Sequence, residues 1–168
     1  MTNKTGNKTG SNAGNNADSK VKIEVGTECD ISGWMCLIDK VRDDFPGLET
    51  DEELREHKRI VLEFMERKSA ICAKIGNCVV GVLLFSKEDG VLWFLAVDTA
   101  YRRQHIAEQM VDFMLMFMEP GKDIVVTTYR AGVSDGKAAR AFYRHLGFVE
   151  GRITEECGSL VQEFRLKR

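Results

Sequence analysis

One junction in the chain carries most of the information, and it reads Leu95-Ala96-Val97-Asp98-Thr99-Ala100-Tyr101-Arg102-Arg103-Gln104-His105-Ile106-Ala107. The apolar run 91–97 predicts a buried central strand. The spacing of apolar residues over 103–118 predicts that a helix follows the basic turn at once. Free N–H groups at a helix start attract anions, and adjacent arginines add positive charge. The junction therefore predicts a phosphate-bearing ligand where the strand ends, although a merely solvated basic turn has the same pattern.

On both sides of this junction, strands and helices alternate along the chain. Thr50 followed by Glu53 is a capping box that opens a helix, and the methionines and phenylalanines over 110–118 are predicted to pack in the core. The expected strands are 21–25, 70–75, 78–86, 91–97, 123–129, 148–154 and 160–166, and the expected helices are 31–45, 50–65, 103–118 and 136–146. The order β-α-α-β-β-β-α-β-α-β-β predicts an α/β fold with a mixed central sheet flanked by helices.

The composition limits the class of protein. With 168 residues, 43% of them hydrophobic and 30% charged, the chain is expected to form one globular domain over 20–168. Residues 1–19 are rich in Asn, Gly and Thr and are expected to be a disordered polar tail. A net charge of −2 lacks the excess of basic residues that is typical of nucleic-acid-binding domains. No stretch approaches the roughly 20 apolar residues of a membrane helix, and no signal region is present, so a cytoplasmic location without membrane contact is expected.

The cysteines give no metal or disulfide signal. They are odd in number and include no C-x-x-C pair, which argues against a zinc site and against a disulfide framework. We expect free, mostly buried thiols and no metal cofactor. The five are Cys29, Cys36, Cys72, Cys78 and Cys157.

A second segment runs from Ala139 through Tyr143 to Gly147-Phe148. By itself it is a helix stopped by glycine, with a tyrosine typical of an amphipathic core position. Together with the junction, about 40 residues earlier, it resembles the GNAT family of acetyl-coenzyme-A-dependent N-acetyltransferases. The family's Arg/Gln-x-x-Gly-x-Gly/Ala loop corresponds to Arg102–Ala107, and its Ala-x-x-x-Tyr-x-x-x-Gly-Phe helix corresponds to Ala139–Phe148.

The resemblance implies a role for each matched residue. The amine attacks the thioester of acetyl-CoA directly, Tyr143 protonates the departing thiolate, and the Val97 amide stabilises the oxyanion. No covalent acyl-enzyme is required. The implied cofactor-binding residues are Leu95, Ala96 and Val97 for the pantetheine arm, Arg102, Arg103, Gln104, His105, Ile106 and Ala107 for the pyrophosphate, and Ala139.

The sequence departs from the family pattern at three positions. His105 replaces a glycine of the loop, Gly136 replaces an asparagine found in many members, and Val91 stands where some members carry a glutamate base. The candidate agents for deprotonating the amine are water, a substrate of low pKa, or an acid of the loop after the first helix. Those acids are Asp43, Asp44 and Glu49.

The sequence therefore predicts an N-acetyltransferase that moves an acetyl group from acetyl-CoA to a primary amine of a small molecule or peptide. The acids near the loop give a weak indication of a cationic acceptor. The alternative is a non-catalytic acyl-CoA-binding or regulatory module on the same fold, which His105 and the missing glutamate favour. The alternating run Leu160–Phe164 is suited to an edge strand, so a homodimer is also possible.

Overall fold

The computed structural model describes residues 20–156 and 158–168. The predicted polar tail and Cys157 lie outside these residues. The strands are β1 (Lys22–Val25), β2 (Ala70–Ile75), β3 (Cys78–Ser86), β4 (Val91–Val97), β5 (Ile124–Tyr129), β6 (Val149–Glu156) and β7 (Ser159–Leu166). The helices are α1 (Ile31–Val41), α2 (Asp51–Glu66), α3 (Ile106–Leu115) and α4 (Lys137–His145), with short 3-10 turns η1 (Glu28–Asp30), η2 (Arg42–Asp44) and η3 (Thr99–Tyr101).

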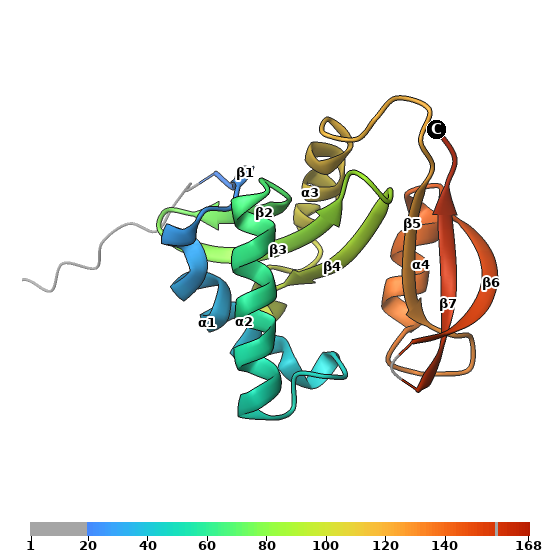
Figure 1. Cartoon of the computed structure of the whole chain (residues 1–168), viewed down its shortest axis with the longest axis horizontal. Coiled ribbons are helices and arrows are strands. Elements are labelled where there is room, and N and C mark those ends of the chain that lie inside the picture. Colours follow the sequence, from blue (N-terminus) through green and yellow to red (C-terminus); the bar gives the residue numbers. More distant parts are fainter. Residues whose placement is uncertain (1–19, 157) are drawn as a thin grey trace, which may run out of the picture.

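The strands form one seven-stranded sheet in the order β1-β2-β3-β4-β5-β7-β6. All neighbouring strands are antiparallel except β4 and β5. Figure 1 shows α1 and α2 in front of the β1–β4 half, while α3 and α4 lie behind the sheet. The predicted α/β class and the order of strands and helices are confirmed.

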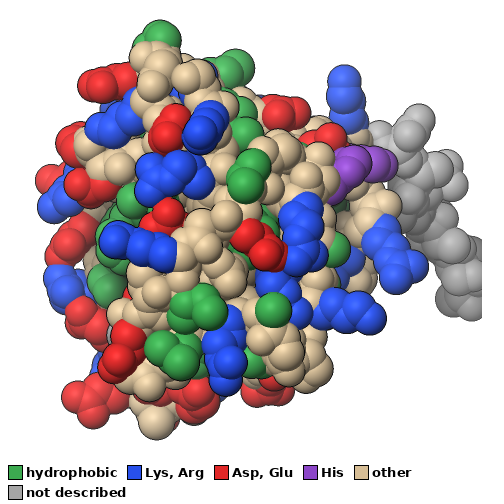
Figure 2. Space-filling model, turned by 90° about the vertical axis from the view of Figure 1, so that its right-hand side faces the viewer, with side chains coloured by type: hydrophobic (Ala, Val, Ile, Leu, Met, Phe, Trp, Pro, Cys, Tyr) green, Lys and Arg blue, Asp and Glu red, His purple; other side chains and the backbone are tan. Residues whose placement is uncertain are grey.

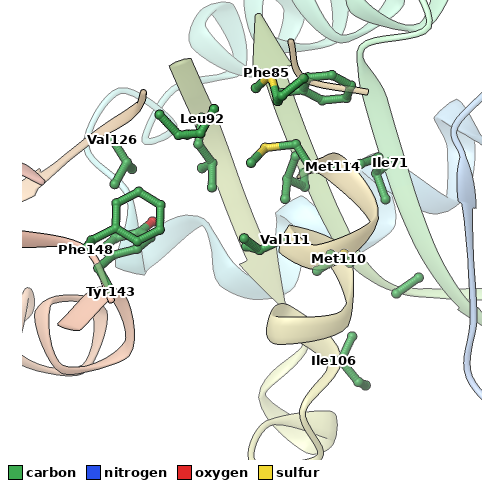
Figure 3. Close-up of a cluster of buried hydrophobic side chains, with 14 of the residues drawn as sticks. Ile71, Phe85, Leu92, Ile106, Met110, Val111, Met114, Val126, Tyr143 and Phe148 are labelled. Atoms are coloured by element: carbon green, nitrogen blue, oxygen red, sulfur yellow. The ribbon is translucent and has the colours of Figure 1, made fainter. Parts of the chain in front are cut away.

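Two buried clusters hold these layers together. One lies between the sheet and α1 and α2 and contains the fully buried Trp34. The other joins α3 to both halves of the sheet and includes Met110 and Met114 together with Tyr143 from α4 (Figure 3). The methionine stripe is therefore core packing, as predicted, except for Met116, whose side chain is 71% exposed.

The bounds of α1 and α3 differ from the sequence expectation, and α3, expected over 103–118, ends at Leu115. The capping box of α2 is confirmed, since Thr50 Oγ1 accepts from the Glu53 N–H at 3.2 Å and Glu53 Oε2 accepts from the Thr50 N–H at 2.8 Å. The helix predicted from 103 begins only at Ile106, because residues with left-handed backbone precede it. The first helix ends at Val41 and continues as the 3-10 turn η2.

The expectation of an edge strand at Leu160–Phe164 was wrong. This run lies in β7, which pairs with β5 on one side and with β6 on the other. Exposure does not alternate along this run, since Leu160 is 52% exposed whereas Gln162, Glu163 and Phe164 are all buried. The edge strands are β1 and β6. On the surface around β6 and β7, acidic and basic side chains are interspersed (Figure 2), so this face carries no field of a single sign.

The thiols are free but are not mostly buried. Cys29, Cys36 and Cys78 are exposed, and among the four described cysteines only Cys72 is buried. Burial raises the pKa of the Cys72 thiol to about 12, so this thiol is unreactive at neutral pH. Within the described part of the chain, no helix combines the length and the apolar character needed to cross a membrane.

Candidate active site

The sheet opens between β4 and β5, which are parallel neighbours. The register of β4 with β5 holds a single pair, Val91 with Val125, beside a bond from the Val125 N–H to the Gly90 carbonyl at 2.8 Å. Beyond that pair the strands diverge, and Figure 1 shows β4 and β5 apart along most of their length. The polar backbone groups on this side of β4 therefore have no partner strand.

The pairing of β4 with β3 determines which groups face this opening. The Asp98 N–H donates to the Val80 carbonyl at 2.9 Å, which makes 98 and 80 a hydrogen-bonded pair. In an antiparallel ladder such pairs alternate with pairs that point their N–H and C=O groups away from each other. Ala96 therefore bonds to β3, opposite Val82, whereas Leu95 and Val97 direct their backbone groups toward β5 and into the opening.

A β-bulge at Trp93 changes the direction of the side chains in β4. Phe85 pairs with Leu92 and Leu84 pairs with Phe94, so Trp93 has no partner in the register. Its side chain is 61% exposed. Because of the extra residue, Leu92 and Leu95 both pack on the cluster at α3, while Phe94 packs on the cluster at α1 and α2.

The turn after β4 presents a run of free amides. Arg103 and His105 have φ angles of 62° and 57°, in the left-handed region. Among the described residues, no backbone or side-chain acceptor bonds the N–H groups from Arg103 to Glu108, and the first helical bond is from the Gln109 N–H to the His105 carbonyl. Consecutive free N–H groups at the start of a ten-residue helix form an anion-binding site. Gln104, Ile106 and Ala107 thus contribute backbone groups here.

His105 occupies the glycine position of the motif without blocking the turn. It adopts the left-handed backbone that glycine would supply, and its Nδ1 lies 2.7 Å from Glu108 Oε2 in the first turn of α3. The imidazole is therefore held by the helix's own side chain and is largely exposed.

This left-handed backbone predicts a stability difference between two variants of His105. Both His105→Gly and His105→Ala remove the contact with Glu108, but only glycine adopts the left-handed region without a steric penalty of roughly 1–2 kcal/mol. After allowance for the greater freedom of glycine in the unfolded chain, we expect His105→Gly to be about 0.5–1 kcal/mol more stable than His105→Ala. Chemical denaturation measures this difference, and equal stabilities would show that the position stores no strain.

The two arginines of the turn have different roles. The Arg102 side chain donates from Nε to the Val97 carbonyl at 3.2 Å and from Nη2 to Asp44 Oδ2 at 2.7 Å. It thereby ties the α1–α2 loop to the end of β4. The Arg103 guanidinium makes no hydrogen bond or ion pair with another described residue.

Sequence reasoning missed Asp98, which anchors the end of β4. Its carboxylate is 4% exposed and accepts from the Ala100 N–H at 3.0 Å and from Lys40 Nζ of α1 at 2.7 Å. The Lys40 hydrogen bond lowers the pKa of this carboxyl, which therefore stays ionised at neutral pH. The available signal was an Asp directly after a strand and before a turn, where an Asp side chain caps free N–H groups.

Tyr143 lies on α4, on the other side of the opening. It is 6% exposed and packs between Phe148 and Phe164, with ring centroids 5.6 and 5.9 Å away. Figure 3 places it beside Val126 of β5, in the cluster that also contains Leu92 of β4. Burial raises the pKa of its phenol, so the hydroxyl carries its proton throughout the neutral range. Ala139 lies one turn earlier on the same face of α4.

Gly136 accounts for the second departure from the motif. A Cβ atom at this position would lie 2.5 Å from Nη1 of Arg140 and would collide with the Cβ of Tyr129. The Arg140 guanidinium donates to the carbonyls of Tyr129 and Arg130 at 3.0 and 2.7 Å, so it cannot move away without losing these bonds. An asparagine does not fit in this local packing.

Acidic side chains surround the side of the opening near the α1–α2 loop. Asp135, Glu49 and Asp44 contribute, after burial, to raising the pKa of Tyr129 at the end of β5. Asp44 is bound to Arg102, and Glu49 accepts from the Gly47 N–H at 2.9 Å. Within the described residues, no group of three or more His, Cys, Asp or Glu side chains is arranged to hold a metal ion.

A cavity of about 270 Å³ lies beside this loop, between α2 and β4. His57 lines it, and the Trp34 Nε1–H donates to His57 Nε2 at 3.3 Å. Burial lowers the pKa of His57 to about 4. A larger groove of about 850 Å³ lies between the end of β1 and α2, away from the opening.

The lowered pKa predicts a specific loss of stability in acid. The unfolded chain binds a proton at His57 near pH 6.5 and the folded chain only near pH 4, so folding stability falls as the pH drops through this window. At pH 5 the expected loss is about 2 kcal/mol relative to pH 7.5. Urea unfolding of wild type and His57→Phe at both pH values isolates the contribution of His57. An identical pH dependence in the two proteins would contradict it.

The structure thus has an opening between β4 and β5, a helix start with free amides beside it, and a buried Tyr143 on α4. The chain belongs to the acetyltransferase (GNAT) family, whose model matches residues 34–148. Members of this family transfer acetyl groups from acetyl-CoA to amines. No protein of curated function matches the sequence.

Solved structures share this fold at low sequence identity. A GNAT acetyltransferase from Bacillus cereus matches with a TM-score of 0.70 and 16% identity, over 89% of this chain and 98% of its own. Ard1 from Thermoplasma volcanium matches with a TM-score of 0.67 and 17% identity, over 88% and 97%. The PaiA N-acetyltransferase from Thermoplasma acidophilum, solved in complex with coenzyme A, matches with a TM-score of 0.62 and 12% identity, over 86% and 98%.

Proposed function

We propose that this protein transfers the acetyl group of acetyl-CoA to a primary amine of a small molecule or peptide. The observation that carries the proposal is the direction of the backbone groups in β4. Leu95 and Val97 point theirs into the opening, and the opening ends at the free amides from Arg103 to Glu108. A chain that ends in a pyrophosphate fits this arrangement, because the arm meets the backbone groups of Leu95 and the Val97 N–H, which no strand pairs, and the phosphates meet the helix start.

Each step of the acetyl transfer is assigned to a particular group. The neutral amine attacks the thioester carbon, a C–N bond forms, and the Val97 N–H stabilises the oxyanion. The C–S bond breaks, and Tyr143 gives its proton to the departing thiolate. The nitrogen of the tetrahedral intermediate loses its excess proton to water or to an acid of the α1–α2 loop, among which Asp43, Asp44 and Glu49 are the candidates. The Tyr143 phenolate then takes up a proton from solvent, which restores the enzyme.

Arg102 has a positioning role in this proposal, because its guanidinium is bound to Val97 and Asp44. Arg103 and the loop amides supply the charge and the donors for the pyrophosphate. Ala139 contributes a small side chain on the α4 face that carries Tyr143, which leaves room beside the cofactor. Ala96 contributes through its pairing with β3, which fixes the directions of its two neighbours.

The first test is a calorimetric titration with acetyl-CoA, beside coenzyme A and ATP. We expect saturable binding of acetyl-CoA, followed by release of free thiol when an amine is added. Binding without thiol release for any amine would support the alternative, a non-catalytic acyl-CoA-binding module, which Val91 in place of a glutamate favours. A folded protein that does not bind acetyl-CoA would contradict both.

A further inference from the structure

The cavity between α2 and β4 has aromatic walls. The rings of Phe45 and Phe94 lie 4.6 Å apart between centroids and are tilted by 38°. The His57 ring meets Phe94 edge-on at 5.1 Å. All three residues line the cavity, which is large enough for one small group rather than a whole cofactor.

His57 adds no positive charge to this wall. Its Nε2 accepts the Trp34 indole N–H at 3.3 Å, so this nitrogen carries a lone pair and the proton of the neutral ring resides on Nδ1. The burial that lowers its pKa keeps the ring neutral in the same range. The cavity thus has a neutral imidazole where a cation would repel an ammonium ligand.

The charged residues that line the cavity are acidic, Glu53 and Glu56. Glu56 also forms an ion pair with Arg59 of the same helix, so Glu53 is the lining carboxylate without a cationic partner among the described residues. Segment 43–56, which contains both glutamates, carries seven acids and one base, Arg55. Aromatic faces with carboxylates at the rim are the surroundings that stabilise an ammonium group.

We propose that this cavity holds the second, non-reacting ammonium group of an acceptor that has two amines joined by a flexible alkyl chain. The inference rests on the proposed function, since it places the other amine at the opening. Phe94 and Val97 lie on the same strand, three residues or about 10 Å apart. An alkyl chain covers that distance along the apolar surface of β4, whereas a compact monoamine reaches only one of the two places.

Two ligands of equal chain length test the second charge directly. In acetyl transfer we expect 1,7-diaminoheptane to have a KM about tenfold below that of heptylamine, which has the same chain and one amine. Phe94→Leu keeps the apolar volume and is expected to raise the KM of the diamine about tenfold with little change in kcat. The KM of heptylamine should hardly change. Equal KM values for the two amines in wild type, or an equal rise for both in Phe94→Leu, would overturn the inference.

Two glutamates of α2 provide a matched pair of charge variants. Glu56 and Glu63 both bind Arg59, but only Glu56 lines the cavity. Glu56→Gln is expected to raise the KM of the diamine about fivefold, and Glu63→Gln should leave it unchanged. A similar effect of both variants would mean that the charge acts through Arg59 or through the general field, and would reject the assignment of the cavity.

A binding measurement separates this inference from the proposed function. The Trp34 indole N–H resonance, assigned with Trp34→Phe, reports on His57 in the protein without cofactor. We expect a saturable shift with 1,7-diaminoheptane, none with heptylamine at the same concentration, and none in folded Phe94→Leu. If no amine is acetylated, this shift still supports the cavity while transfer fails, and its absence rejects the cavity whether or not transfer occurs.

Discussion

Tyr143→Phe is expected to lower kcat for acetyl transfer by about 10²–10⁴-fold, with little change in the affinity for acetyl-CoA. The substitution removes one hydroxyl from a ring that packs between Phe148 and Phe164 and leaves that packing in place. Burial raises the pKa of this phenol, so the proton is present when the thiolate leaves, while the same shift makes the phenol a weaker acid. Without it, the thiolate departs unprotonated or takes its proton from water.

The measurement is kcat under conditions in which chemistry limits the rate, shown by a kcat that does not depend on solvent viscosity. Tyr101→Phe is the matched control, since it removes a phenol from the turn η3 and not from α4. Thermal unfolding of both variants verifies that the fold persists. Full transfer by Tyr143→Phe under these conditions would remove Tyr143 from the mechanism.

Deleting the Val97 N–H alone is expected to lower kcat/KM by about 10²–10³-fold. An amide-to-ester substitution at this position exchanges the N–H for an oxygen and keeps the side chain. Because Val97 directs its N–H away from β3, the sheet loses no hydrogen bond. The substitution therefore removes only the N–H that faces the reacting carbonyl. Single-turnover kinetics measures the resulting fall in the transfer rate.

The same substitution at Ala96 is the control. The Ala96 N–H bonds to β3, so its loss is expected to cost about 1 kcal/mol of folding free energy and to leave the transfer rate nearly unchanged. The reverse pattern, with activity sensitive to Ala96 and not to Val97, would place the oxyanion donor elsewhere on β4.

The fold was predictable because periodicity depends on short stretches of sequence. The capping box at Thr50 and the apolar run of β4 each determine a local structure, which then becomes part of the sheet or of a helix beside it. The edge position was not predictable in this way. The residues of β7 do not indicate how many strands pair with it, and both β5 and β6 do.

The parts of the candidate site that depend on a local backbone motif were predictable from the sequence. The side-chain contacts between residues far apart in the sequence were not. The anion site at the start of α3 follows from the motif, but the left-handed backbone at Arg103 and His105 was not predicted, because the helix was expected to begin at 103. The bond of Arg102 to Asp44 joins residues 58 positions apart, and so does the bond of Lys40 to Asp98. No local pattern indicates these partners, because the packing of α1 against the end of β4 creates them.

Because β4 diverges from β5 after Val91, this central strand has backbone groups without a partner strand on one side, as an edge strand has. Amide hydrogens that lie in a ladder exchange slowly with heavy water, whereas unpaired ones exchange when solvent reaches them. Along β4, protection should therefore alternate residue by residue, strong at Phe94 and Ala96 and weak at Leu95 and Val97. A bound acetyl-CoA would slow the exchange of the Leu95 and Val97 amides. Hydrogen exchange at these two positions would therefore report whether the opening is occupied.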